Sequence, residues 1–260
     1  MLALVGLLAG CGGSGSATLY VLFDASDSSS TLIREGYRVG AVLMGTEFCQ
    51  QHPGSGEIDF SAITASAEVN TQFESLQCPR RINNTDFQAK MLVFGSQLEA
   101  TVNDISLYQE PVRGTDIIGA ILYGANQTFD RFKPKSRYLV VFSDMQQFGD
   151  GVRPCVQKSG AAHAADCLSV YFKRHPEFDA KRPELQDTAV FVIGVGQTAG
   201  GSLGRSEILA YRAFWKVFFR REHAKVCSYG TPNLPVTNNS DGTQSIPSKY
   251  FSADCLPIRF

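Results

Sequence analysis

The chain has 260 residues, of which 43% are hydrophobic and 19% are charged, so it can bury the core of an ordinary globular protein. Its 24 lysine and arginine residues balance 25 aspartate and glutamate residues, which argues against nucleic acid or an anionic surface as partner. Neither a C-x-x-C motif nor a Cys/His zinc spacing is present, which argues against a zinc site.

The first ten residues are apolar or small and lead to Cys11. This run is too short to span a bilayer, and small residues before its end are typical of a secretory signal. Residues 8–11 (LAGC) resemble the lipobox of bacterial lipoproteins, although no lysine or arginine precedes the apolar run. The resemblance implies a signal peptide over residues 1–10, a lipid on Cys11 and a flexible tether over residues 11–17. The alternative is an ordinary apolar N-terminus.

Six cysteines remain without Cys11, an even number in an exported chain, which predicts up to three disulfides and an oxidising compartment. Sequence alone does not separate the fifteen pairings that six cysteines allow. The simplest prediction pairs sequence neighbours, namely Cys49 with Cys78, Cys155 with Cys167, and Cys227 with Cys255.

The first predicted strand covers residues 19–23, an apolar run that leads straight into Asp24. An unbroken apolar run rich in β-formers is typical of a strand buried on both faces. Asp24, Ser26 and Ser28 then follow at alternate positions, at the sheet edge where ligands bind in open α/β sheets. One carboxylate and two hydroxyls within a turn suit Mg²⁺, which prefers oxygen ligands. The alternative is that these residues cap the next helix.

The middle of the chain shows both the helical spacing of apolar residues and the alternation of apolar and polar residues that is typical of strands. Apolar residues at helical spacing predict helices over residues 33–48 and 86–107. Alternation predicts a half-buried strand over residues 58–65, and a further short strand is expected over residues 73–78. A loop at residues 113–116 then opens another helix.

A second apolar run, residues 138–142, leads through Ser143 to Asp144 and brings another carboxylate to the same edge. After it we expect a polar, irregular insertion over residues 145–186 that contains one helix, over residues 161–175. The remaining elements are a buried strand over 188–195, a helix over 203–225 and an extended surface tail over 227–260. Strands and helices thus alternate, which predicts an α/β domain with a doubly wound, mainly parallel sheet and helices on both faces.

The three loops together resemble those of a von Willebrand factor A domain, in which they form the metal-ion-dependent adhesion site. The resemblance rests on D-x-S-x-S after a strand, Gly-Thr before a helix and an acid at a strand end, in the family's order. It implies that the hydroxyls of Ser26 and Ser28 bind Mg²⁺ or Mn²⁺ and that Thr115 joins them when ligand is bound. Asp24 and Asp144 would hold metal-bound waters. An ion without a direct carboxylate ligand keeps its charge available for an acidic side chain of a partner protein.

Two residues depart from the family, which usually has glycine where Asp27 and Met145 stand. Asp27 places a second carboxylate near the ion, which either tightens binding or displaces the loop. Met145 lacks the backbone freedom of glycine, so we expect the third loop to take a different path. A degenerate scaffold that holds no metal is therefore an alternative.

Two other interpretations compete with the binding site. G-x-G-x-x-A at residues 194–199 fits the dinucleotide fingerprint, but it follows the last strand instead of opening the first βα unit. The acids Asp24 and Asp144 also suit a metal-dependent phosphoryl hydrolase of the haloacid dehalogenase type. That family has a second aspartate where Ser26 stands, so a protein-binding domain without catalytic activity is the favoured interpretation.

The predicted organisation is one von Willebrand factor A-like domain over residues 18–226, carried on a lipid anchor that faces the periplasm of a bacterial envelope. Gly12, after Cys11, resembles the sorting pattern of outer-membrane lipoproteins. We expect residues 145–186 and 194–204 to contact the partner, because both segments leave the sheet at the edge that carries the predicted metal site.

Overall fold

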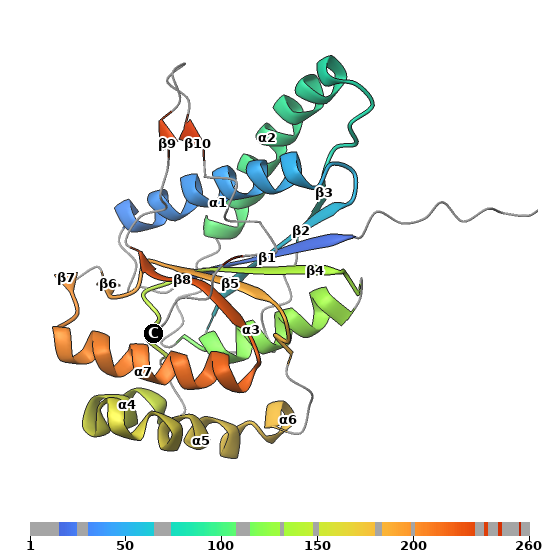
Figure 1. The fold of residues 1–260 in the computed structure, drawn as a ribbon. Coiled ribbons are helices and arrows are strands. Elements are labelled where there is room, and N and C mark those ends of the chain that lie inside the picture. Colours follow the sequence, from blue (N-terminus) through green and yellow to red (C-terminus); the bar gives the residue numbers. More distant parts are fainter. Residues whose placement is uncertain are drawn as a thin grey trace, which may run out of the picture.

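The computed structural model describes residues 16–24, 31–64, 74–107, 115–130, 133–147, 151–179, 184–198, 201–231, 237–238, 244–245 and 255. They form a six-stranded sheet with helices on both faces, in the order β3-β2-β1-β4-β5-β8 (Figure 1). Its strands are β1 (Ala17–Asp24), β2 (Gly56–Ile63), β3 (Glu74–Gln77), β4 (Ser136–Phe142), β5 (Ala189–Ile193) and β8 (Lys225–Thr231). All neighbouring pairs are parallel except β2 and β3. The predicted doubly wound, mainly parallel α/β sheet is confirmed.

Strand β1 lies inside the sheet, and its residues 19–23 are apolar on both faces. Every residue from Ala17 to Asp24 is buried, and the strand pairs with β2 on one side and β4 on the other. Tyr20 and Leu22 join one core cluster, while Val21 and Phe23 join the cluster on the opposite face. An uninterrupted apolar run is what such two-sided burial requires.

The helices form a layer on each face of the sheet. Helices α1 (Thr31–Gln51) and α2 (Asn84–Leu107) cover one face, and α3 (Ile117–Ala125) and α7 (Arg205–Arg221) cover the other (Figure 1). The remaining elements are α4 (Val152–Ser159), α5 (Ala164–Arg174), α6 (Pro176–Asp179), the short helices η1 (Asn126–Asp130) and η2 (Ala161–His163), and the two-residue strands β6 (Gln197–Thr198), β7 (Gly201–Ser202), β9 (Thr237–Asn238) and β10 (Gln244–Ser245). None of the helices in the described ranges is long and apolar enough to cross a bilayer.

Strand β2 differs from the half-buried strand that its alternation predicted. It spans Gly56–Ile63 rather than residues 58–65, and its polar residues Asp59 and Ser61 are buried. The hydroxyl of Ser75, on the antiparallel neighbour β3, donates a hydrogen bond to the Asp59 carboxylate. Alternating polarity therefore does not mark a solvent-facing side here, because helices cover both faces of the sheet.

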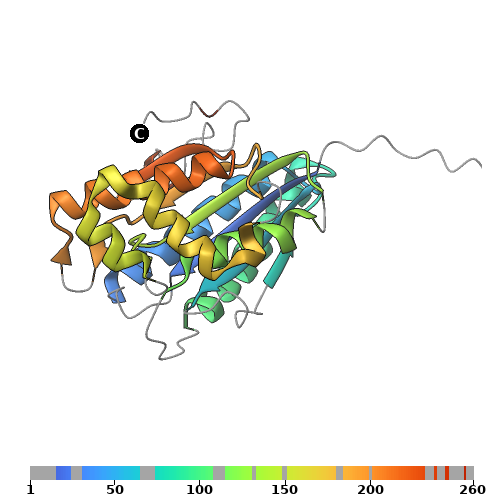
Figure 2. The same cartoon turned by 90° about the horizontal axis from the view of Figure 1, so that it is seen from below.

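The region predicted as an irregular insertion is largely helical where the structure describes it. Helices α4 and α5 form an outer layer beyond α7 (Figures 1 and 2). The helix expected over residues 161–175 is present as η2 and α5, whereas α4 was missed. Helix α4 is eight residues long and buries only Val152 and Val156, which is too little apolar repetition to reveal a helix.

The C-terminal prediction is also wrong in part. Helix α7 ends at Arg221 rather than residue 225, and β8 begins at Lys225 and forms an edge of the sheet. The first residues of the predicted surface tail therefore belong to the sheet. The pairing of β8 with β5 shifts register twice, and Gly230 has a φ of 83°, so no regular alternation marks this strand.

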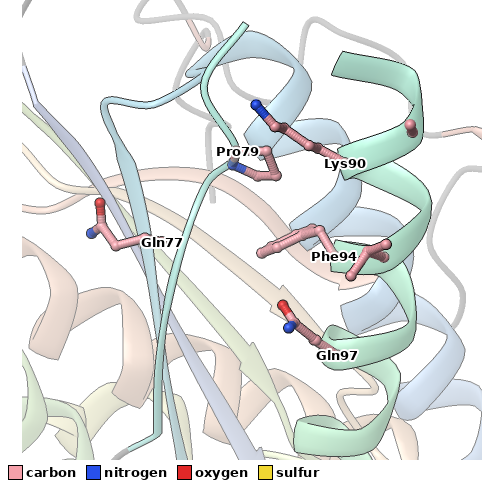
Figure 3. A pocket seen from close by; sticks show the side chains of 7 residues that line it. Gln77, Pro79, Lys90, Phe94 and Gln97 are labelled. Atoms are coloured by element: carbon pink, nitrogen blue, oxygen red, sulfur yellow. The ribbon is translucent and has the colours of Figure 1, made fainter. Parts of the chain in front are cut away.

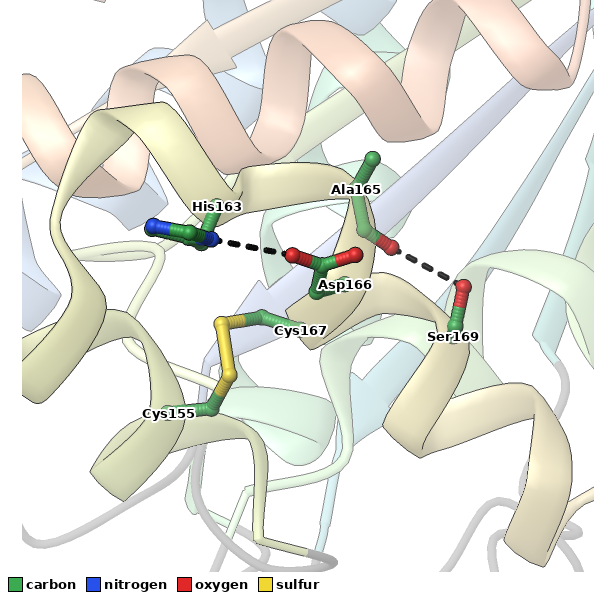
Figure 4. Close-up of a disulfide and its surroundings, with 6 residues drawn as sticks. All are labelled: Cys155, His163, Ala165, Asp166, Cys167 and Ser169. Atoms are coloured by element: carbon green, nitrogen blue, oxygen red, sulfur yellow. Dashed lines mark hydrogen bonds and ion pairs between the residues drawn. A yellow bond between two sulfur atoms is a disulfide. The ribbon is translucent and has the colours of Figure 1, made fainter.

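Three disulfides join the cysteines in the predicted pairs, Cys49–Cys78, Cys155–Cys167 and Cys227–Cys255. The second of them links α4 to α5 (Figure 4). Cys11 and its tether, up to residue 15, lie outside the described residues.

Candidate functional site

The ends of β1 and β4 bring two of the predicted site residues together. The strands are parallel neighbours in which Phe23 pairs with Phe142, so Asp24 and Asp144 leave the sheet at the same edge. The hydroxyl of Ser143 donates a 2.6 Å hydrogen bond to Oδ2 of Asp24. Both aspartates are 2% exposed. The predicted convergence of the two strand-end acids is confirmed.

The loop before α3 reaches the same edge. The backbone N–H of Asp116 donates a 2.8 Å hydrogen bond to the carbonyl of Thr64, directly after the end of β2. Strand β2 pairs with β1 up to Ile63 and Asp24, so the buried Thr115 stands beside the end of β1. The structure thus gathers Asp24, Thr115 and Asp144. Ser26 and Ser28, together with Asp27, lie outside the described residues.

Met145 occupies the position where the resemblance implies glycine. Its φ is 62°, a left-handed conformation that glycine adopts freely and that costs about 1 kcal/mol or more for other residues. Two hydrogen bonds hold it: its N–H donates to the Ser143 hydroxyl at 2.9 Å, and its carbonyl accepts from the Trp215 indole at 2.8 Å. Met145 thus holds a backbone conformation that glycine adopts more readily.

The carboxylate of Asp144 is oriented by Gln146. The Gln146 backbone N–H donates to Oδ1 at 2.8 Å, and its side-chain amide donates to Oδ2 at 2.9 Å. The carbonyl of Asp144 accepts from the N–H of Gly196 at 3.1 Å, which ties the loop after β4 to the turn after β5. Each carboxylate oxygen has two lone pairs, so these bonds orient the group without using all of its acceptor capacity.

Asp116 and Gln147 form a second polar network that caps α3. Oδ1 of Asp116 accepts from the Gly119 N–H at 2.9 Å, from the Gln147 amide at 3.0 Å and from the Tyr171 hydroxyl at 3.1 Å. The side-chain carbonyl of Gln147 accepts from the N–H groups of Ile117 and Ile118. Burial raises the pKa of Asp116, and these hydrogen bonds oppose the rise. The network holds Thr115 in place by fixing the start of the helix.

Gln146 and Gln147 were not predicted, and no sequence signal identifies them. They follow a strand-end acid in an apolar context, but their partners are Asp144, two residues before, and Asp116 across the fold. Asp116 itself carried a recognisable signal, because aspartate directly before an apolar helical run is a preferred N-cap.

Tyr37 of α1 reaches the same edge from above the sheet. A Cβ atom on Gly194 would lie 2.0 Å from the hydroxyl oxygen of Tyr37, so only glycine fits there. The ring centroid of Tyr37 lies 5.5 Å from that of Phe142. Burial raises the pKa of Tyr37 well above its ordinary value, and the carboxylates of Asp24 and Asp144 raise it further. The phenol is therefore protonated at neutral pH.

This packing also explains the glycine motif that resembles a dinucleotide fingerprint. Gly194 makes room for Tyr37, and Gly196, with a φ of 76°, forms the turn whose N–H binds Asp144. The local fold accounts for both glycines without a phosphate. The last residue of the motif, Ala199, lies outside the described residues.

The donor atoms at this edge are all oxygen, which suits a hard cation such as Mg²⁺. Among the described residues no three side chains of histidine, cysteine, aspartate or glutamate gather as a metal site. The edge therefore offers two carboxylates and Thr115, and a complete ligand set would need the hydroxyls of Ser26 and Ser28.

A separate hollow of about 360 Å³ lies between the end of β3 and α2 (Figure 3). Pro79, Val93 and Phe94 form much of its wall, with Lys90 at its rim. Gln77, which also lines it, pairs with Glu57 at the start of β2, so the hollow lies at the opposite end of the sheet from Asp24. It carries no convergent set of polar groups and is not part of the candidate site.

No family model matches the sequence, and no curated protein is significantly similar to it. The solved structures that resemble the chain include an aerotolerance-related membrane protein from Bacteroides fragilis NCTC 9343, with 12% identity and a TM-score of 0.41 over 84% of this chain and 94% of that one. They also include the pilus adhesin SpaC from Lactobacillus rhamnosus GG in an open conformation, with 8% identity and a TM-score of 0.43 over 85% of this chain. This chain spans 28% of the adhesin's length. Likenesses of this size carry no conclusion about function.

Proposed function

We propose that this chain is a non-catalytic binding domain of the von Willebrand factor A type, which holds Mg²⁺ or Mn²⁺ and thereby engages an acidic side chain of a partner protein. The observation that carries the proposal is the convergence of Asp24, Thr115 and Asp144 from three separate loops at one buried edge. These residues are those that the three-loop resemblance implies, in the same order.

The described residues fit a hard cation in three respects. Their donors are oxygens, both carboxylates are held by hydrogen bonds from Ser143 and Gln146, and the Thr115 loop is fixed by the capped helix α3. Ser26 and Ser28 would complete the ligand set. A bound ion would supply a positive charge with an open coordination position, to which a carboxylate of a partner is attracted.

The cellular setting belongs to the same proposal. Three disulfides favour an oxidising compartment, and a lipid on Cys11 would anchor the domain to the envelope, facing the periplasm, in the outer membrane. Partner contacts would come from the segments that surround the edge, which include the start of α4 and the turn after β5.

Isothermal titration calorimetry with MgCl₂ and MnCl₂ tests the metal site. We expect wild type to bind and Asp144→Asn to lose at least about tenfold in affinity, because the carboxylate charge is removed from a buried site. Asp187→Asn is the matched control, since Asp187 is an exposed carboxylate at the opposite end of β5 that pairs with Lys225. Binding that is absent at millimolar metal, or equal in all three proteins, would contradict the proposal.

Capture from envelope extract tests the partner. Wild type is expected to retain a protein that both chelator and Asp144→Asn release, because the ion would bridge the two proteins. Retention of the same protein under all conditions would show that the partner does not bind at the sheet edge that holds Asp24 and Asp144. Hydrolysis of a generic phosphate ester by wild type, lost in Asp24→Asn, would instead favour the phosphoryl hydrolase.

A further inference from the structure

Two buried tyrosine hydroxyls near the candidate ion site have no hydrogen-bond partner among the described residues. Tyr37 is 4% exposed and Tyr211 is 1% exposed, and the hydroxyl oxygen of each is buried and unpaired. Leaving a buried hydroxyl unpaired is unfavourable, so such a group points to a ligand or a water that belongs there.

Tyr37 approaches the edge from the face covered by α1. Its hydroxyl lies against Gly194, the residue that follows β5, and its ring packs on Phe142 at the end of β4. These contacts place the hydroxyl at the ends of β4 and β5, and β4 leads directly to Asp144. The side chain cannot turn away freely, because the ring is wedged between these two residues.

Tyr211 approaches from the opposite face, where α7 lies (Figure 1). One turn later on the same side of this helix, Trp215 donates its indole hydrogen bond to the carbonyl of Met145. Tyr211 therefore faces the same loop, next to Asp144. Burial raises the pKa of Tyr211 to about 12. The carboxylates of Asp144 and Glu207 add to this rise, and Arg153 opposes it. It is thus a neutral phenol, able both to donate and to accept.

We infer that the hydroxyls of Tyr37 and Tyr211 belong to the ion site and bind the water shell of the cation from the two faces of the sheet. The inference rests on the proposed metal binding and deepens it. Phenols and carboxylates are suitable hydrogen-bond partners for water, and Mg²⁺ retains several waters when it binds to proteins. Each phenol would accept a hydrogen bond from a water of the shell. The ion that these residues favour is a small cation bound with its waters, rather than Ca²⁺ enclosed by protein oxygens.

The test compares Tyr37→Phe, Tyr211→Phe and the double variant with wild type, using calorimetry for Mg²⁺ affinity and thermal melting in EDTA for stability. Each substitution is expected to weaken Mg²⁺ binding about fivefold and the double variant about 25-fold, the effect of losing one or two net hydrogen bonds. Without metal, both single variants should melt at or above the wild-type temperature, because each removes an unpaired buried hydroxyl.

Tyr138→Phe is the matched control. Tyr138 is a buried tyrosine near the start of β4, away from the carboxyl edge, and its loss should leave Mg²⁺ affinity unchanged. If wild type binds Mg²⁺ and the Tyr37 and Tyr211 variants bind it equally well, the inference is overturned and the metal site stands. Variants that lose metal-free stability in proportion to affinity would show a purely structural role. Absence of binding by wild type would remove both the inference and the proposed function.

Discussion

The indole N–H of Trp215 donates a 2.8 Å hydrogen bond to the carbonyl of Met145. Both residues are fully buried, and the bond connects the middle of α7 to the loop that carries Asp144. It therefore couples the packing of one face of the sheet to the conformation of the candidate site.

Replacing Trp215 by Phe should destabilise the protein by about 2 kcal/mol, because the smaller ring leaves a cavity and the Met145 carbonyl loses its donor. Urea unfolding followed by circular dichroism measures the change. Leu209→Ala, at a half-exposed position of the same helix, should cost much less. Equal effects of the two substitutions would mean that the indole makes no special contribution.

The left-handed backbone at Met145 predicts that a glycine variant is more stable than an alanine variant, the reverse of the usual order. Both substitutions remove a fully buried side chain, but only glycine adopts a φ of 62° without strain. We expect Met145→Gly to be more stable than Met145→Ala by about 1 kcal/mol, although both are less stable than wild type. The same urea titration decides the order. An alanine variant as stable as the glycine variant would indicate that the loop relaxes out of the left-handed conformation.

The buried carboxyl group of Glu222 should make the free energy of unfolding depend on pH. This residue caps α7, is 4% exposed and accepts a 3.1 Å hydrogen bond from the N–H of Glu184. Burial raises the pKa of its carboxyl group, against the opposing effects of that N–H and of Arg221. An acid with a raised folded-state pKa stabilises the protein fully below its unfolded pKa, and this contribution is lost as pH rises through the folded value.

Glu222→Gln removes that titration and keeps an acceptor for the N–H of Glu184. Its free energy of unfolding relative to wild type should therefore increase as the pH rises from about 4 to 7. Denaturant titrations at several pH values measure the difference. Glu177→Gln, at a more exposed site, controls for the loss of one carboxylate. A difference that falls with pH would mean that Arg221 outweighs burial at this site.

The Cys155–Cys167 disulfide should contribute most of the rigidity of the α4–α5 pair (Figure 4). It closes a loop with a sequence separation of 12, and its loss is expected to cost about 3 kcal/mol in the chain-entropy model. The double variant Cys155→Ala and Cys167→Ala, compared with wild type by thermal melting, tests this value. Mass spectrometry of non-reduced peptides checks all three pairs, and free thiols in exported protein would contradict both the pairing and the oxidising compartment.

Local patterns along the chain were enough to predict the strands that carry the site. The apolar runs before Asp24 and Asp144 are local patterns, and parallel strands of an α/β sheet place their carboxyl ends at one edge, so the meeting of these acids followed from the class of fold. Thr115, by contrast, came only from the resemblance of the three loops to a von Willebrand factor A domain. The disulfide pairing of sequence neighbours was also correct, since each bond joins two cysteines separated by no more than 29 residues.

The hydrogen bonds that hold those residues could be identified only from the folded structure. Ser143 binds Asp24 across a sequence separation of 119, and Gln147 binds Asp116 across a separation of 31. Tyr37 and Tyr211 share a periodic helical pattern with ordinary core residues, so nothing local distinguishes a phenol at the site from one in the core. Strand β8 escaped notice because its pairing shifts register. Hydrogen bonds between residues far apart in the sequence depend on strand order and helix packing. Local periodicity of apolar residues carries no information about either.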